Sequence, residues 1–186
     1  MNSLVGALER AQRALTASGI QSAAIGALAL SIWGRARATS DVDLKVLVAR
    51  DRAADLLAAL PGYTPLVEEP LQVIQRLGFV FLRDPQGVRI DLLLADAGFD
   101  EGAVRRAREV EVLPGHRAVV CTAEDLVIYK LISTRPRDHE DAESVVLRQG
   151  AALDVAYVET WLRELEMALD DSTLVEAFQR MRRLAL

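Results

Sequence analysis

Apolar residues recur along the chain with two different spacings, one of three to four residues and one of two residues. The first is typical of an α-helix with one buried face, and the second of a strand with one buried face. Glycine and proline close most segments, and 63–77 carries no clear pattern. Helical spacing predicts helices at 2–18, 28–33, 51–60, 101–108, 137–148, 155–169 and 173–184, and one more that begins after Thr122. Alternation and short apolar runs predict strands at 21–25, 41–48, 79–83, 88–94, 110–113 and 118–121.

The segment 41–48 has the clearest strand pattern. Its even-numbered positions are all aliphatic, whereas Asp41, Asp43 and Lys45 occupy odd-numbered ones. Because side chains alternate between the two faces of a strand, Asp41 and Asp43 are expected to share the face opposite the apolar one. Residues spaced in this way stand roughly 6.5 to 7 Å apart, so their carboxylates can converge on one cation. A pair of this kind also occurs where a loop enters a strand and the acids only cap backbone donors.

A third acid is expected on a neighbouring hairpin. The tetrapeptide at 84–87, Asp-Pro-Gln-Gly, has the residues that a type I turn prefers, and it joins the strands predicted at 79–83 and 88–94. In the second strand Ile90 and Leu92 share one face, so Asp91 faces the other.

The order of the elements indicates an α+β fold. Strands and helices are mixed in residues 1–121, and only helices are predicted in 122–186. No segment rich in proline, glycine or serine separates these two parts. We therefore expect a mixed β-sheet flanked by helices, with a C-terminal helical layer packed on it in one structural unit.

Composition narrows the class of protein. Hydrophobic residues make up 51% and charged residues 26% of the 186 positions, which excludes a disordered chain. The longest nearly apolar stretch, 23–34, is much shorter than the roughly 20 residues of a membrane-spanning helix. The start of the chain lacks the features of a signal peptide, and Cys121 has no second cysteine to pair with, so we expect a cytoplasmic protein. A net charge of −5 argues against a protein that coats nucleic acid.

Two blocks of the sequence resemble the DNA polymerase beta-like nucleotidyltransferase superfamily, and within it the minimal AbiEii-like branch. The first block matches at Gly26, Gly34, Arg37, Thr39, Asp41 and Asp43. The second matches at Lys130, Arg135, Arg137, Asp138 and Asp141. Asp91 falls where the family places its third carboxylate. The resemblance implies a nucleotidyltransferase-like mixed sheet flanked by helices.

The resemblance also implies a reaction. A nucleoside monophosphate would pass from a nucleoside triphosphate to an acceptor hydroxyl, and pyrophosphate would leave. Asp41, Asp43 and Asp91 would hold two Mg²⁺ or Mn²⁺ ions, because ligation by oxygen alone suits these hard cations. Asp91 would also help to take the proton of the acceptor.

Nucleotide contacts are implied at six positions: Gly26, Ala27, Arg37, Thr39, Lys130 and Asp141. Gly26 lets the backbone approach the phosphates, Lys130 contacts the triphosphate, and Asp141 orients Lys130. The position after Gly26 is usually Gly or Ser in the family, and Ala27 lacks the serine hydroxyl.

Several alternatives stay open. Proteins of the AbiEii-like branch often act as toxins on tRNA or other cellular targets, which implies an antitoxin-type protein partner, whereas similar minimal proteins modify small molecules such as antibiotics. The acceptor is therefore RNA, protein or a small molecule. A rival hypothesis is a catalytically inactive module that binds a nucleotide or a partner. Lys130 alone also fits an exposed helix lysine, Arg37 a solvent-facing loop arginine, and Asp138 a charge in the first turn of a helix.

Overall fold

The computed structural model describes residues 2–96 and 98–185, which divide into two compact units. The first unit runs up to Leu28 and resumes over Ala38–Cys121; the second comprises Ala29–Arg37 and the chain from Thr122 onward. Strands of the first unit are β1 (Gln21–Ala24), β2 (Asp41–Leu47), β3 (Thr64–Pro65), β4 (Phe79–Arg83), β5 (Arg89–Leu94), β6 (Arg108–Leu113) and β7 (His116–Val120). Its helices are α1 (Asn2–Ala17), α3 (Ala53–Ala58), α4 (Pro70–Leu77) and α5 (Phe99–Arg106), with a 3-10 turn at Arg50–Arg52.

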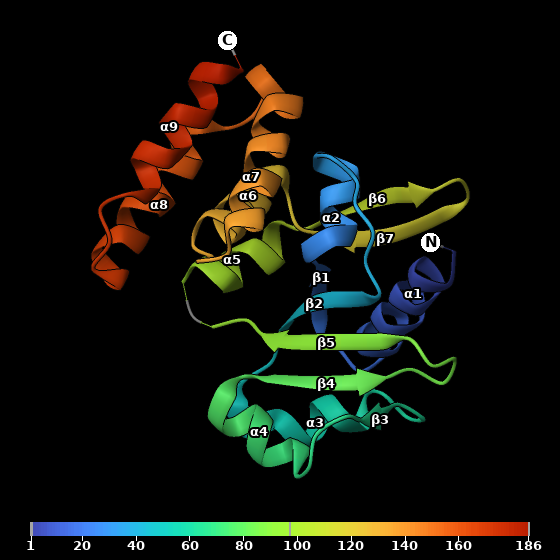
Figure 1. Ribbon diagram of the computed structural model, residues 1–186. Helices are drawn as coiled ribbons and strands as arrows, with labels where there is room; N and C mark the ends of the chain where they lie inside the picture. Colours follow the sequence, from blue (N-terminus) through green and yellow to red (C-terminus); the bar gives the residue numbers. More distant parts are fainter. Residues whose placement is uncertain (1, 97, 186) are drawn as a thin grey trace. The chain divides into compact units, whose positions relative to one another are not determined.

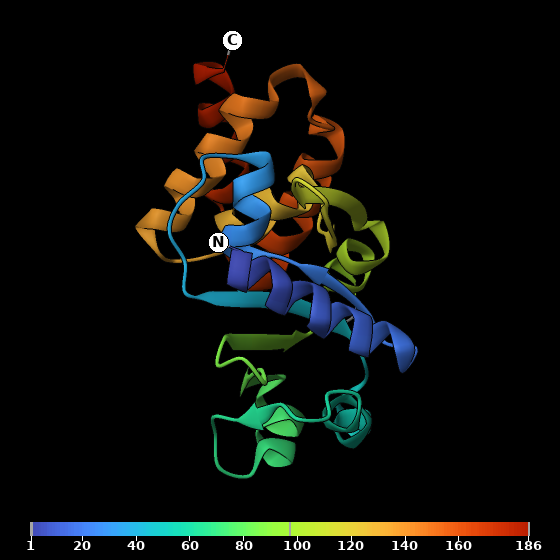
Figure 2. The same cartoon turned by 90° about the vertical axis from the view of Figure 1, so that its right-hand side faces the viewer.

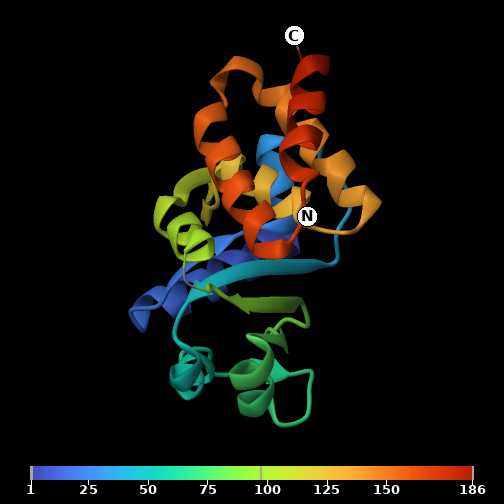
Figure 3. The same cartoon turned by 90° about the vertical axis from the view of Figure 1, so that its left-hand side faces the viewer.

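Helices alone make up the second unit. Helix α2 (Gly26–Trp33) begins in the first unit and continues into the second. The other helices of the second unit are α6 (Ala123–Leu131), α7 (Pro136–Gln149), α8 (Val155–Leu169) and α9 (Leu174–Leu184), with a 3-10 turn at Gly150–Ala152. Helix α6 contacts α7, α8 and α9, and α8 lies beside α9 (Figure 3). None of the helices in residues 2–96 and 98–185 is long and apolar enough to cross a membrane.

The strands of the first unit form one sheet in the order β3-β4-β5-β2-β1-β7-β6 (Figure 1). Strand β2 runs parallel to β5, and β1 runs parallel to β7, whereas the remaining neighbours are antiparallel. This mixed sheet with flanking helices confirms the predicted α+β class.

One face of the sheet supplies the core of the first unit. Val42, Leu44 and Val46 of β2 are fully buried, and the register places them beside Ile90, Leu92 and Leu94 of β5. Helix α1 packs against β1, β2 and β7 and contributes Leu8 and Leu15, which are also fully buried (Figure 2). The alternation of β2 is therefore the one predicted, with its odd-numbered side chains on the other face.

Three local features differ from the sequence prediction or add to it. Helix α2 begins at Gly26, two residues before the predicted start. The segment without a clear pattern contains β3 and α4, and α4 begins at Pro70, where the missing N–H of proline costs nothing. Gly78 ends α4 in the left-handed region, with φ of 73°.

Other local signals behave as predicted. The N–H of Gly87 donates to the carbonyl of Asp84 at 2.9 Å, which closes the turn between β4 and β5. The hydroxyl of Thr122 accepts from the N–H of Asp125 at 3.2 Å and caps α6.

Candidate functional site

The first unit brings the three predicted acids together on one face of its sheet. In the parallel pair of β2 and β5, Asp43 lies opposite Asp91, and Asp41 lies opposite Arg89. Paired residues of neighbouring strands point to the same side and are about 4.8 Å apart. Asp41 and Asp43 are partly exposed, whereas Asp91 is 8% exposed. The side chains of all three acids therefore project from the face opposite the apolar core.

Arg89 is a cation on the same face as these acids. Its Nε lies 2.6 Å from Oδ1 of Asp91 and its Nη2 lies 2.8 Å from Oδ2, so both carboxylate oxygens are engaged. The guanidinium also lies over the ring of Phe81, with Cζ 4.4 Å from the ring centroid. The hydrogen bonds to Asp91 raise the pKa of Arg89, burial opposes them, and the charges of Asp91, Asp41 and Asp43 raise this pKa further.

Gly26 lies against the second acid. Its φ is +65°, and a Cβ at this position would lie 2.0 Å from Oδ2 of Asp43, which no side chain permits. The N–H of Ile25 donates to the carbonyl of Asp43 at 3.0 Å. The glycine turn therefore packs directly against Asp43. Ala27, the next residue after Gly26, is buried.

Two further side chains shape the acid face. The Thr39 hydroxyl donates to Oδ1 of Asp41 at 2.5 Å, which fixes the orientation of this carboxylate. Lys45 lies two residues beyond Asp43 on the same face of β2 and forms an ion pair with Asp100 of α5. Its Nζ also donates to the carbonyl of Leu94 at 3.3 Å.

The donor set fits a hard divalent cation. It consists of carboxylate oxygens, the ligands that Mg²⁺ and Mn²⁺ prefer. Within the described parts of the chain, no three or more His, Cys, Asp or Glu side chains are arranged to hold a metal ion. A guanidinium, itself a cation, is bound to Asp91.

Lys130 is buried in the second unit. It is 5% exposed, and its Nζ lies 2.5 Å from Oδ1 of Asp138 and 2.9 Å from Oδ2 of Asp141. The alternative of an exposed helix lysine is therefore wrong. Arg37 joins the same network, with its Nε 3.2 Å from Oδ2 of Asp141, and is not a loop arginine that faces only solvent.

Asp138 is more than a charge in the first turn of α7. It is 2% exposed, and in addition to Lys130 it accepts from the Ser133 hydroxyl at 2.7 Å and from Nε of Arg135 at 2.5 Å. Burial would raise the pKa of Asp138, but the hydrogen bonds from Lys130, Ser133 and Arg135 and the charge of Lys130 outweigh burial and lower it.

Gly34, the other glycine of the resemblance, serves packing within the second unit. A Cβ there would lie 2.6 Å from the hydroxyl oxygen of Ser144 and 2.8 Å from a methyl group of Val145. The carbonyl of Gly34 accepts from Nη1 of Arg148 at 2.7 Å. The close approach of α7 therefore requires the glycine.

Sequence reasoning missed the part that Arg89 takes in the site. The signal was the spacing of two residues between Arg89 and Asp91 on a strand, which puts both side chains on one face. The two histidines are half-buried: Nδ1 of His116 is 3.1 Å from a carboxylate oxygen of Glu9, and Nε2 of His139 is 2.8 Å from the carbonyl of Ser133.

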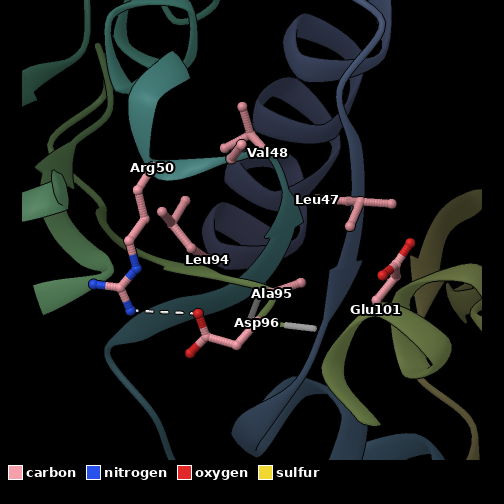
Figure 4. Close-up of a pocket in the computed structure, with 8 residues that line it drawn as sticks. Leu47, Val48, Arg50, Leu94, Ala95, Asp96 and Glu101 are labelled. Atoms are coloured by element: carbon pink, nitrogen blue, oxygen red, sulfur yellow. Dashed lines mark hydrogen bonds and ion pairs between the residues drawn. The ribbon is translucent and has the colours of Figure 1, made fainter. Parts of the chain in front are cut away.

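A cavity of about 330 Å³ lies at the carboxyl ends of β2 and β5, away from the acids (Figure 4). Arg50 and Asp96 form an ion pair of 3.3 Å at its rim, and Glu101 pairs with Arg105. None of the predicted site residues lines this cavity. Its lining residues are Leu47, Val48, Ala49, Arg50, Leu94, Ala95, Asp96 and Glu101.

No protein-family model and no curated protein sequence matches the chain. Among solved structures, the chain is similar to the solution structure of the antibiotic-resistance factor ANT(2'')-Ia, with a TM-score of 0.61 and 15% identity over 91% of this chain and 96% of that one. The crystal structure of ANT(2'')-Ia in complex with adenylyl-2''-tobramycin matches with a TM-score of 0.56 and 14% identity over 87% and 98% of the two chains. An antigenic nucleotidyltransferase-like protein from Paracoccidioides brasiliensis matches with a TM-score of 0.47 and 17% identity over 95% and 93%. The chain therefore shares the fold of ANT(2'')-Ia.

Proposed function

We propose that the chain is a metal-dependent nucleotidyltransferase that moves a nucleoside monophosphate from a nucleoside triphosphate to an acceptor hydroxyl. The observation that carries the proposal is the pairing of Asp43 with Asp91 on adjacent parallel strands, with Gly26 against the Asp43 carboxylate. Clustered acids repel one another unless cations offset their charge, and Arg89 supplies one positive charge beside three carboxylates. The excess of negative charge on this face supports binding of a cation.

Asp41, Asp43 and Asp91 are the residues that would hold Mg²⁺ or Mn²⁺. When bound, the metal supplies positive charge to the phosphate oxygens and lowers the cost of charge that develops in the transfer. Thr39 holds Asp41 in position through its hydroxyl. The acceptor oxygen forms a bond to the α-phosphorus, the bond from that phosphorus to pyrophosphate breaks, and Asp91 accepts the acceptor proton.

Phosphate binding is proposed at the turn of Gly26 and Ala27, where α2 begins and its first N–H groups have no partner within the helix. Only backbone donors are available at Ala27. The triphosphate contacts of Arg37 and Lys130 stay predictions from the resemblance, and both side chains form ion pairs with Asp141 within the second unit. The 2.9 Å ion pair between Lys130 and Asp141 supports the orienting role of Asp141.

The acceptor class is a separate part of the proposal. One of the structures that share the fold holds an adenylylated antibiotic, adenylyl-2''-tobramycin. We propose that the acceptor of this chain is the hydroxyl of a small molecule. The alternative is an AbiEii-like activity on tRNA or protein, restrained by an antitoxin-type partner, and the test below distinguishes the two.

A second candidate is a catalytically inactive module that binds a nucleotide or a partner protein. The engagement of both Asp91 oxygens by Arg89 favours this candidate, because a carboxylate held in this way is a poor metal ligand and proton acceptor. Ala27 favours it as well, since the turn lacks a hydroxyl that would contact phosphate.

The test is transfer of label from α-³²P nucleoside triphosphates. The purified chain is incubated with each triphosphate, Mg²⁺ or Mn²⁺, and separate acceptor pools of aminoglycosides, total tRNA and cell protein. The proposal expects label in one pool, release of pyrophosphate, and a loss of at least about 1,000-fold in D43N. Tight nucleotide binding by calorimetry without label in any pool would establish the inactive module instead.

A further inference from the structure

The two side chains of the Arg89–Asp91 ion pair differ strongly in their exposure to solvent. The Asp91 side chain is 12% exposed, and it projects from β5, which lies between β2 and β4 in the sheet. The Arg89 side chain is 44% exposed. If this ion pair opens, the arginine is the side chain with room to move, because its end reaches solvent while Asp91 stays in place.

The ring of Phe81 is a second contact for the guanidinium of Arg89. It lies opposite Asp91 in the antiparallel pair of β4 and β5, so its ring is on the face of the acids. The guanidinium already lies 4.4 Å from the centre of this ring. An arginine that releases Asp91 can therefore keep its stacking on Phe81, which lowers the cost of release.

We propose that Arg89 is a latch on Asp91: its guanidinium occupies the carboxylate when no metal is bound, and it must leave before Asp91 can ligate a divalent cation. This inference rests on the proposed function, because it concerns the same three acids. It makes the contribution of Asp91 to metal binding conditional on the residue at position 89.

The latch differs from simple repulsion between Arg89 and a metal ion. Repulsion depends on charge alone, whereas the latch depends on the two-pronged contact of a guanidinium with both carboxylate oxygens. A lysine at position 89 keeps the charge but offers a single ammonium. R89K and R89Q therefore separate the two explanations.

The experiment is a double-mutant cycle read out as Mn²⁺ affinity, by calorimetry and by the loss of the free Mn²⁺ signal in electron paramagnetic resonance. The full chain is compared with R89Q, R89K, D91N and R89Q/D91N. The latch predicts that R89Q binds Mn²⁺ about tenfold more tightly, the size expected when one charged hydrogen-bonded contact is released. R89K should gain more than half of that increase on a logarithmic scale. D91N should change the affinity less than about twofold alone and remove the gain of R89Q.

R83Q is the matched control, because Arg83 lies opposite Arg89 on β4, is exposed, and donates to the carbonyl of Gly87 instead of an acid. It should leave Mn²⁺ affinity unchanged. Thermal melting of each variant confirms that it is folded, and R89K serves in place of R89Q if the latter does not fold.

The outcomes separate the latch from the proposed function. An R89K affinity equal to that of the parent chain, or equal effects of D91N in both backgrounds, would overturn the latch while metal binding stands. If no folded variant binds Mn²⁺, both the metal-dependent function and the latch fail.

Discussion

The conformation of Gly26 is set by two demands that only glycine meets together. Its φ of +65° is costly for other residues, and the space where a Cβ would lie is filled by the Asp43 carboxylate. Gly87 meets only the first demand, since its φ is +87° and nothing lies within 4 Å of a Cβ built there. The two glycines therefore allow the cost of the close contact to be measured apart from the cost of the backbone.

Substitution of Gly26 by alanine is expected to cost about 3 kcal/mol of unfolding free energy, from backbone strain and from displacement of Asp43. G87A should cost only about 1 kcal/mol, the backbone part. Urea denaturation measures both variants. Equal costs for the two would show that Asp43 moves away freely, and that the glycine turn does not fix the second acid.

Helices α6 and α7 of the second unit are joined by buried charges as well as by apolar contacts. Lys130 on α6 reaches two carboxylates one turn apart on α7, Asp138 and Asp141. A buried ion pair adds little net stability compared with apolar packing, but removal of one partner is destabilising because it leaves a buried charge uncompensated. The network therefore fixes which faces of α6 and α7 meet.

K130M is expected to lower the free energy of unfolding by about 3 to 5 kcal/mol, because it leaves two buried carboxylates without their shared cation. The control is R135Q, which removes another partner of Asp138 whose side chain is 77% exposed. This control should cost less than about 1 kcal/mol. Chemical denaturation provides both values, and a K130M variant as stable as the parent chain would contradict a structural role for the network.

The lowered pKa of Asp138 predicts how stability depends on pH. A carboxyl group with a folded pKa below its unfolded value of about 3.9 stabilises the fold above that value. This contribution disappears as the pH falls through the folded pKa. The parent chain should therefore lose stability more steeply than D138N below about pH 4, when unfolding is followed at a series of pH values. Parallel curves would show that Asp138 does not titrate with unfolding.

The molecule as a whole shares its fold with ANT(2'')-Ia at 15% identity. The apolar face of the sheet explains how this is possible, since many aliphatic combinations fill the same core as long as their spacing is kept. The proposed reaction would tolerate far less change at Asp41, Asp43 and Asp91, because few other side chains supply the same oxygen ligands.

Ligand binding should appear as a change in the stability of the whole chain. A nucleoside triphosphate with Mn²⁺ at 100 times its dissociation constant adds about 2.7 kcal/mol to the unfolding free energy and raises the melting temperature. D43N without ligand should melt at the same or a higher temperature, because a repulsive charge is removed. The same variant should lose the shift caused by the triphosphate with Mn²⁺. Differential scanning calorimetry checks both expectations, and an equal shift in D43N would place the nucleotide elsewhere.

Local features of this protein could be read from its residues because each depends on near neighbours in the chain. The alternation at 41–48 predicted that Asp41 and Asp43 share one face of the strand, and Thr122 predicted the start of α6. The turn at 84–87 gave the hairpin that carries Asp91. The same reasoning left β3 and α4 unassigned, since β3 has only two residues and α4 has only eight, in a segment whose neighbours show no matching pattern.

Contacts between distant segments required the folded chain. The pairing of Asp43 with Asp91 depends on which strands become neighbours and in what register, and the alternation within one strand carries no such information. The same holds for the Asp43 carboxylate against Gly26, for the burial of Lys130 between two aspartates, and for the binding of Arg89 to Asp91. Side-chain period is a property of the local backbone, whereas partners are chosen by the packing of the whole unit.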